Sequence, residues 1–215
     1  MAFCIKGIEM FEKVSIIIPV YKQETELENL LADLAPIKDN AEIILKSEGS
    51  RAKSLNAGAA VAARPFLWFL HADSRINEQN LHELSRALKE KPDVLHYFDL
   101  AFGKDGPALT PINAWGANWR SRLFGVPYGD QGFCLSKDMF MKTTGYPEDV
   151  PYGEDLMFVW RARQAGIRLN RLPSKLLTSA RKYAQKGWLR LTFLYQWRWI
   201  GMSIPEALKM IWEKT

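Results

Sequence analysis

The sequence VSIIIPV at residues 14–20 decides the fold class of this chain. It is short, rich in β-branched residues and almost continuously apolar, which is typical of a strand covered on both faces in a parallel sheet. We therefore expect residues 14–20 to form the first central strand of an α/β sheet with helices on both faces.

Strand and helix patterns alternate after this first strand. Thr25 and Glu28 are spaced as a capping box, and the leucines that follow at helical spacing up to Pro36 predict an amphipathic helix. The next predicted elements are strand 41–45, helix 51–62, strand 66–70, helix 79–89 and strand 94–102. This order favours right-handed βαβ crossovers, and in such sheets ligands bind beyond the carboxyl ends of the strands.

The pattern becomes irregular after a turn at residues 103–107. The later predicted elements are strand 131–135, helix 154–165 closed by Gly166, short strands 167–172 and 176–180, and two tail helices, the second opening at Ser203 with Pro205 in its first turn. No repeat or linker divides the chain, so we expect residues 1–215 to form a single domain. Its core is expected over about 14–181, and a basic, Trp-rich helical tail over about 182–215.

The composition excludes several classes of protein. The chain has 215 residues, of which 47% are hydrophobic, enough for one sizeable core. Cys4 and Cys134 match no zinc, redox or disulfide-framework spacing. Charged residues interrupt the apolar start of the chain, which argues against a signal peptide. We expect a cytoplasmic protein.

The tail combines positive charge with aromatic residues. The net charge is +5, all of it arising after residue 180, and half of the tryptophans lie there. One helical face would hold Trp188, Leu191, Leu194, Tyr195 and Trp199, with Arg190 and Arg198 in water. This pattern suits peripheral contact with the inner face of a membrane, or alternatively core packing or a homodimer interface. No nucleic-acid-binding motif is present, and charged residues interrupt any membrane-spanning run.

Two acidic motifs are candidates for chemistry. Asp73 follows the buried strand 66–70 at the edge where ligands bind, so its carboxylate could hold Mg²⁺ or Mn²⁺ together with a diphosphate. The alternative is a short polar residue that ends a strand. His71 could contact a metal or a phosphate, or be a hydrogen-bonded rim residue.

The second motif is Glu154-Asp155, which opens a predicted helix after a segment containing Gly and Pro. Acidic residues favour the positive N-terminal end of a helix, which is one explanation for this pair. The other explanation is a general base that removes a proton from a sugar hydroxyl.

The motifs follow one another as VSIIIPVYKQ, NAGAA, FLWFLHADS, YGDQGFCLSK and GYPEDVPYGEDLMFVWRARQAG. This series resembles the family-2 glycosyltransferases, which implies a GT-A-type, Rossmann-like fold. The likeness extends from residue 14 to the end. It is closest to a bacterial subgroup named for arsenosugar biosynthesis, whose shared segments correspond here to residues 115–122, 128–132 and 178–181.

The resemblance implies a role for each candidate residue. Asp73 matches the last position of the DxD-type motif that meets the metal and the donor diphosphate, His71 replaces the first acid, and Asp155 matches the catalytic base. Arg51 and Arg181 would approach the diphosphate, and Asp130, Gln131 and Glu154 would line the sugar and acceptor pocket. Asp130 could instead be a turn residue beside Gly129, and Arg181 simply part of the basic tail.

The chain departs from the family pattern between its second strand and the NAGAA helix. Family members carry an acidic turn, a further strand and part of a helix there, whereas residues 46–51 (KSEGSR) lead straight into the helix. Glu48 could replace the missing acid that holds the base and ribose, or form a solvated surface pair with Lys46 and Arg51.

The predicted function is inverting, metal-assisted transfer of a sugar from a UDP- or GDP-linked donor to an unidentified acceptor hydroxyl. The alternative is a non-catalytic nucleotide- or anion-binding protein that lost its donor site through the shortened segment. A nucleotidyltransferase is disfavoured because no glycine-rich basic loop follows the first strand.

Overall fold

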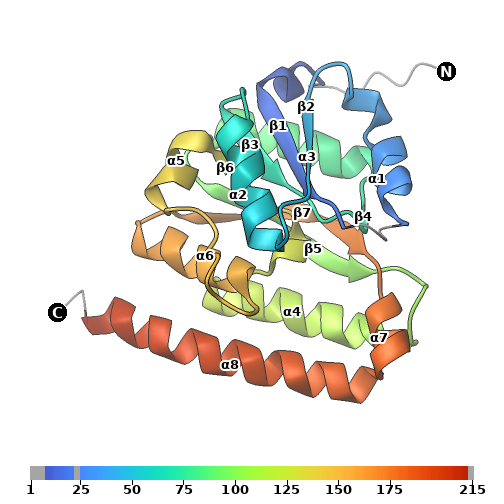
Figure 1. The fold of residues 1–215 in the computed structure, drawn as a ribbon, viewed down its shortest axis with the longest axis vertical. Helices are drawn as coiled ribbons and strands as arrows, with labels where there is room; N and C mark the ends of the chain where they lie inside the picture. The colour runs from blue at the N-terminus through green and yellow to red at the C-terminus, as the bar shows by residue number, and fades with distance from the viewer. Residues whose placement is uncertain (1–7, 22–24, 213–215) are drawn as a thin grey trace.

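The computed structural model describes residues 8–21 and 25–212. Its centre is a seven-stranded sheet with the strand order β2-β1-β3-β6-β5-β7-β4 (Figure 1). The strands are β1 (Val14–Pro19), β2 (Glu42–Lys46), β3 (Phe66–Phe69), β4 (Ser74–Arg75), β5 (Leu95–Phe102), β6 (Cys134–Ser136) and β7 (Leu169–Thr178).

The sheet is mixed but mainly parallel. β1 pairs in parallel with β2 and β3, and β5 pairs in parallel with β7 along a long ladder. β6 joins the two parallel groups through antiparallel pairs, and the short β4 pairs antiparallel with β7. The predicted α/β class with a central first strand is confirmed.

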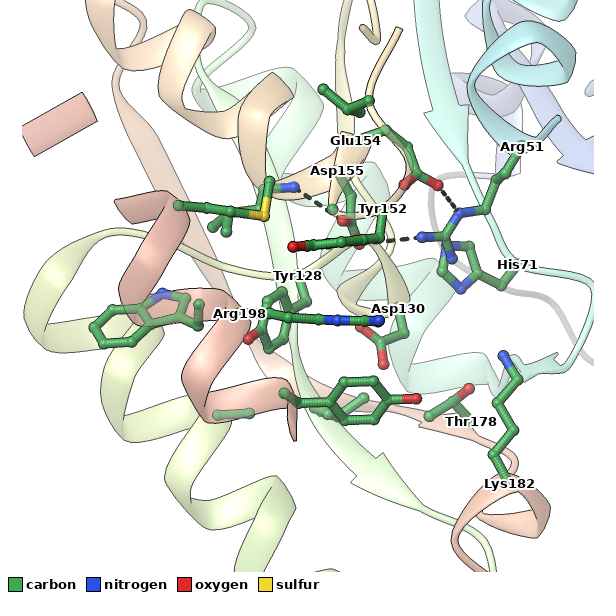
Figure 2. Close-up of a pocket in the computed structure, with 18 of the residues that line it drawn as sticks. Arg51, His71, Tyr128, Asp130, Tyr152, Glu154, Asp155, Thr178, Lys182 and Arg198 are labelled. Atoms are coloured by element: carbon green, nitrogen blue, oxygen red, sulfur yellow. Dashed lines mark hydrogen bonds and ion pairs between the residues drawn. The ribbon is translucent and has the colours of Figure 1, made fainter. Parts of the chain in front are cut away.

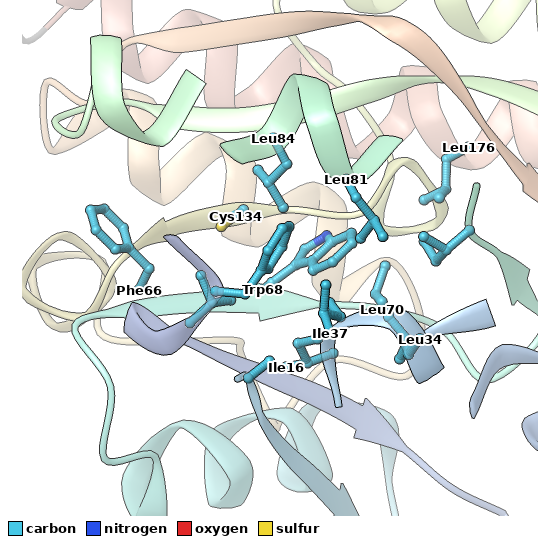
Figure 3. Close-up of a cluster of buried hydrophobic side chains, with 14 of the residues drawn as sticks. Ile16, Leu34, Ile37, Phe66, Trp68, Leu70, Leu81, Leu84, Cys134 and Leu176 are labelled. Carbon is cyan, nitrogen blue, oxygen red and sulfur yellow. The ribbon is translucent and has the colours of Figure 1, made fainter. Parts of the chain in front are cut away.

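Alternate residues of the central strands enter two separate cores, one on each face of the sheet. Ile16 and Trp68 lie in the first core, whereas Ile17 and Leu67 lie in the second. Figure 3 shows the first core, in which the Trp68 ring lies among aliphatic side chains from several elements. Both faces of β1 are therefore dry, as its continuous apolar sequence predicts.

Helices cover both faces of the sheet (Figure 1). The helical segments before β5 are η1 (Ile8–Lys13), α1 (Leu27–Asp33), η2 (Ala35–Ile37), α2 (Arg51–Val61) and α3 (Glu78–Glu90). The capping box predicted at Thr25 is wrong, because α1 begins after Glu26 and no side chain caps it. The α-helix α1 ends at Asp33, before Pro36. Pro36 itself lies within the 3₁₀-helix η2, so a helical turn continues past the predicted stop.

Two helices lie in the stretch where the sequence pattern is irregular. They are α4 (Thr110–Phe124) and α5 (Lys137–Lys142), and a short η3 (Gly129–Gln131) lies between them. α4 has Pro111 in its first turn and ends at Gly125 in the left-handed conformation, with φ 63°. Its large apolar side chains are exposed rather than directed at the core, so the usual amphipathic signal is missing.

Two strand predictions need correction. Strand 131–135 is wrong at its start, because Gly132 has φ 63°, and β6 begins only at Cys134. The two short strands expected over 167–172 and 176–180 are one strand, β7. Its register with β5 shifts between Leu172 and Lys175, where Pro173 cannot donate a ladder hydrogen bond.

The C-terminal part contains α6 (Glu154–Gln164), α7 (Arg181–Lys186) and α8 (Trp188–Trp212). The predicted end of α6 is confirmed, with Gly166 at φ 76°. The predicted helix start at Ser203 is wrong, because α8 continues through Pro205. Gly201 and Pro205 are both exposed, so the carbonyl that Pro205 leaves without a helical donor faces water.

Of the alternatives considered for the predicted apolar face of α8, packing against the protein is the one that the structure shows. Leu191 is buried, Tyr195 and Trp199 line a cavity, and the Trp188 Nε1–H donates to Asn113 Oδ1 of α4. Arg190 is exposed as predicted, whereas Arg198 is half-buried and its guanidinium packs over the Tyr152 ring. Among the described helices, none is both long enough and apolar enough to cross a membrane.

Candidate functional site

A cavity of about 710 Å³ lies at the carboxyl edge of the parallel strands. Tyr21 after β1, Asp73 after β3 and Thr178 of β7 line it from the sheet. The helices α4 and α8 contribute Asn113, Ala117, Arg120, Thr192, Tyr195, Gln196, Arg198, Trp199 and Met202. Figure 2 shows side chains from these separate segments converging on one space. The site therefore lies where the strand order predicts it.

Arg51 connects the acidic pair to the sheet edge. Ser50 caps α2 by accepting a hydrogen bond from the Lys53 backbone N–H (3.2 Å), which places Arg51 in the first turn of the helix. The Arg51 Nε–H donates to Glu154 Oε1, and Arg51 Nη2 lies 3.8 Å from Asp155 Oδ2. Burial lowers the pKa of Arg51, but the carboxylates of Asp155 and Glu154 outweigh it and hold the pKa above its ordinary value.

His71 is held as a neutral ring. Its Nε2 lies 3.4 Å from Arg51 Nη1, and because a guanidinium can only donate, Nε2 is the acceptor and the ring proton lies on Nδ1. Burial lowers the pKa of His71 well below its ordinary value, and the charges of Arg51 and Lys182 lower it further. The His71 lone pair is therefore used inside the protein, which makes His71 a positioning group for Arg51.

Asp155 is fixed by backbone donors. Its Oδ2 accepts from the Gly129 N–H (2.8 Å), and its Oδ1 accepts from the Leu156 N–H (2.9 Å). A Cβ at Gly129 would lie 2.7 Å from Asp155 Oδ2 and 3.1 Å from His71 Nε2. Only glycine lets the YGDQG turn approach Asp155 this closely, so the turn and the acidic motif form one unit.

The segment before Asp155 is attached to α2 by Asn56. The Asn56 side chain accepts from the Tyr146 N–H (2.9 Å) and donates to the Tyr146 carbonyl (2.8 Å). It also donates to Glu148 Oε1 (2.8 Å). The NAGAA segment therefore positions the loop that leads into Gly153 and α6, although its residues lie far from Asp155 in sequence.

Asp73 and Asp130 form an acidic side of the cavity with Asp155. Burial raises the pKa of Asp130 to about 6, the charges of Asp155 and Asp73 raise it too, and Arg51 opposes them. Asp73 accepts a 3.4 Å hydrogen bond from Thr178 Oγ1. Carboxylates that repel one another in a partly buried cavity are a place where a bound cation would relieve the repulsion.

The carboxylates that line the cavity fit Mg²⁺ or Mn²⁺ only if a bound ligand supplies further oxygen atoms. In the part of the chain that the structure describes, no group of three or more His, Cys, Asp or Glu side chains is arranged to hold a metal ion. Mg²⁺ in nucleotide sites is usually held by one or two carboxylates, with substrate phosphates and water completing the shell. Asp73 fits that kind of site.

Three predicted site residues do not line the cavity. Glu48 is exposed, and its backbone N–H donates a hydrogen bond to Ser54 Oγ. Gln131 is fully buried and bonds to Ser121, to the Tyr128 N–H and to the Phe98 carbonyl, so it supports the YGDQG turn. Arg181 Nη1 donates to Thr25 Oγ1 (3.1 Å) and lies 4.0 Å from Glu26 Oε1, at the edge of the sheet.

The structure brings in residues that sequence reasoning missed. Lys182, next to Arg181, lines the cavity in its place. Arg120 is 4% exposed, and its guanidinium lies 4.1 Å from the Tyr128 ring and 5.2 Å from the Trp199 ring. Arg198 lies 4.0 Å from the Tyr152 ring. Arg120 and Tyr128 lie in segments 115–122 and 128–132, which this chain shares with the bacterial subgroup that it resembles. That sharing is the one signal in the sequence that could have identified them as site residues.

Comparison with known proteins supports the fold. No protein-family model and no curated protein matches the sequence. The fold is similar to the crystal structure of S. aureus TarS 1–349, with a TM-score of 0.61 at 15% sequence identity over 78% of this chain and 60% of that chain. The same TarS region in complex with UDP-GlcNAc has a TM-score of 0.60 at 15% identity, over 78% of this chain and 58% of that chain. Its complex with UDP also has a TM-score of 0.60, at 14% identity over 78% and 60% of the two chains.

This chain therefore spans about 60% of the length of the TarS 1–349 structure. At this level of identity the likeness shows the fold, and the predicted GT-A-type class is confirmed. The predicted subgroup, the roles of the site residues and the metal stay predictions.

Proposed function

We propose that the chain is an inverting glycosyltransferase that uses a nucleotide-sugar donor, UDP- or GDP-linked, and a divalent cation. The observation that carries this proposal is that Asp73 and Asp155, far apart in sequence, line the same cavity at the ligand-binding edge of a GT-A-type sheet. The likeness to TarS structures that contain UDP-GlcNAc and UDP supports a nucleotide-sugar donor.

In the proposed reaction, an Asp155 oxygen accepts the proton of the acceptor hydroxyl as that oxygen bonds to C1 of the sugar. The bond from C1 to the diphosphate oxygen breaks, and the nucleoside diphosphate leaves with the electron pair, which inverts the configuration at C1. A bound Mg²⁺ or Mn²⁺ would supply charge stabilisation to the leaving diphosphate, and Asp73 would hold it. Lys182 also lines the cavity and supplies a further positive charge.

The donor base would lie against the remaining short segment. β2 passes to α2 through residues 47–50, and Gly49, Ser50 and Arg51 line the cavity there. Tyr21 lines the cavity from the end of β1, and its ring is about half exposed. We propose that the Tyr21 ring stacks on the donor base, which in the family that the sequence resembles is held by the absent acidic turn.

The first prediction concerns the two aspartates. Asp155→Asn removes the proton acceptor while keeping the side-chain shape, so it should lower donor turnover about 10²- to 10⁴-fold. Asp73→Asn should lower turnover and weaken its dependence on Mn²⁺. The measurement is release of UDP or GDP from a panel of nucleotide sugars, with Mn²⁺, Mg²⁺ or a chelator. Asp138→Asn, at an exposed position of α5, is the matched control and should behave as the wild type. Wild-type turnover in both site variants would show that the roles are wrong.

A non-catalytic anion-binding protein is the second candidate, and Arg120 favours it. Within the described residues, the buried Arg120 Nε and Nη2 have no hydrogen-bond partner. A buried cation left in this way is a recognition group for a phosphate or a carboxylate. Calorimetry separates the two candidates. Binding of UDP or GDP without turnover of any donor supports the second, and Mn²⁺-dependent turnover supports the first.

A further inference from the structure

The outer side of α8 is apolar along its whole length. Large apolar side chains recur there every three or four residues and are between 42% and 81% exposed; they are Leu189, Phe193, Trp197, Ile200, Ile204, Leu208 and Trp212, called the α8 stripe here. At this spacing they share one side of the helix. The other side of α8 already packs on the protein and lines the cavity, so the core does not use the stripe.

A second apolar stripe lies on the neighbouring helix. Ile112, Trp115, Trp119 and Leu123, called the α4 stripe, recur at helical spacing and are all more than half exposed. α4 and α8 lie side by side at one edge of the molecule, where Asn113 bonds to Thr192 (Figure 1). The exposed Phe124 ring contacts both helices. Its centroid lies 6.1 Å from that of Trp119 in α4 and 5.7 Å from that of Trp199 in α8. An exposed apolar surface of this extent marks an interaction site.

Almost all charged residues of the two helices that carry the stripes and of the adjoining α7 are positive. The helices α4, α7 and α8 contain Arg120, Arg122, Arg181, Lys182, Lys186, Arg190, Arg198 and Lys209, and their single acidic residue is Glu206. Glu206 is buried and is paired with Lys209 and Gln164. Arg122, Lys186, Arg190 and Lys209 are exposed, and of these Arg122 is paired with Asp99 and Lys209 with Glu206. The partner of this surface should therefore be apolar in its interior and negatively charged at its surface.

We propose that the α8 and α4 stripes dock the protein on the surface of a bilayer that contains anionic lipids. Exposed Trp and Phe suit the boundary between headgroups and acyl chains, and the surrounding Lys and Arg suit anionic headgroups. A second copy of this chain would instead bring two positively charged surfaces together. Because the inner sides of the same two helices line the cavity, a docked membrane would lie beside the site.

Vesicle flotation of the full chain tests this proposal. The wild type should float with phosphatidylcholine vesicles that contain phosphatidylglycerol, bind pure phosphatidylcholine vesicles much more weakly, and be released by salt. The double variant Phe193→Glu with Trp197→Glu places two charges in the middle of the α8 stripe. It should lower binding to the anionic vesicles by roughly tenfold or more. Circular dichroism and thermal unfolding check that the variant folds.

Met141→Glu is the matched control, because Met141 is an exposed apolar residue of α5, outside both stripes. It should bind vesicles as the wild type does. The double variant should keep wild-type donor turnover in vesicle-free buffer, since its side chains do not line the cavity, which separates failure of docking from failure of the proposed function. Equal vesicle binding by the wild type and the double variant would overturn the proposal. So would light scattering that shows a wild-type dimer, made monomeric by the double variant, with no vesicle binding.

Discussion

Gly129 shows how one residue can hold together two motifs of the site. It donates its backbone N–H to Asp155, and its missing side chain leaves room for both Asp155 and His71. Arg51 then bonds to Glu154 and contacts His71, so the acidic pair, the histidine and the turn depend on one another. A change at any one of these positions should therefore move the others.

The prediction for this residue is that Gly129→Ala lowers both stability and activity. A Cβ 2.7 Å from the Asp155 carboxylate forces the turn or the aspartate to move, at a cost of about 1–3 kcal/mol in the free energy of unfolding. Urea unfolding and donor turnover are the two measurements. Gly116→Ala in α4 is the control, because nothing lies within 4 Å of its Cβ position. The control should raise stability by about 0.5–1 kcal/mol, since alanine favours a helix.

The pKa of Asp130, which burial raises to about 6, makes the stability of the protein depend on pH. The folded protein binds this proton more tightly than the unfolded chain does, so stability should fall as pH rises from about 4 to about 6. Asp130→Asn removes this effect. The variant should be more stable than the wild type at pH 7 by about 1–3 kcal/mol, and the advantage should vanish near pH 4.

Urea unfolding at a series of pH values measures this difference. An equal difference at pH 4 and pH 7 would contradict the assignment to Asp130. In the same experiment, saturating Mn²⁺ should reduce the advantage of the asparagine variant at pH 7, because a cation near Asp73 and Asp130 stabilises the charged carboxylate.

The NAGAA helix, α2, holds a loop of another part of the chain in place through Asn56. Asn56 in α2 holds the backbone at Tyr146 through a donor and an acceptor, and it also bonds to Glu148. The loop that Asn56 holds ends at Gly153, which has φ 74° and is the N-cap residue of α6. The position of Asp155 in the cavity thus depends on a side chain of another helix.

Asn56→Ala should free this loop. The expected loss is about 1–3 kcal/mol of unfolding free energy, because two buried backbone groups of Tyr146 lose their partner. Hydrogen exchange should become faster over residues 145–153, and donor turnover should fall, because Asp155 is less firmly placed. Asn29→Ala, which removes an exposed bond to Glu26, should leave exchange over 145–153 unchanged. Unaltered exchange in the Asn56 variant would show that the loop is held by other contacts.

The helices α4 and α8 each line the cavity on one side and expose apolar residues on the other. Their inner sides complete the cavity with Arg120, Tyr195 and Trp199, and their outer sides carry the two apolar stripes. This arrangement explains why sequence periodicity failed here. The large apolar residues of α4 are exposed and its buried side is small or polar, so α4 was missed, and α8 has large apolar residues on both sides, so periodicity could not show which side packs on the protein.

Parts of the fold and of the site were predictable from local sequence. Continuous apolar runs identified β1 and β3, because both faces of these strands are buried. Asp73 and Asp155 were found because one ends a buried strand and the other opens a helix, and both lie at the edge where parallel sheets bind ligands. Arg120, Lys182 and Tyr21 were missed, since nothing in their own neighbourhoods indicates that distant segments converge on them.

The α/β class and the central strands follow from apolar patterns within a few residues of each position, whereas Asp73 and Asp155 are local candidates that were singled out by the family resemblance, and their roles stay predictions. Long-range contacts determine that His71 Nε2 faces Arg51, that Gln131 and Glu48 lie outside the cavity, and that Lys182 lines it whereas Arg181 does not. Those outcomes depend on which segments burial brings together. The same is true of α8. Its packing against α4 and α6 determines which of its two apolar sides faces the protein and which is exposed.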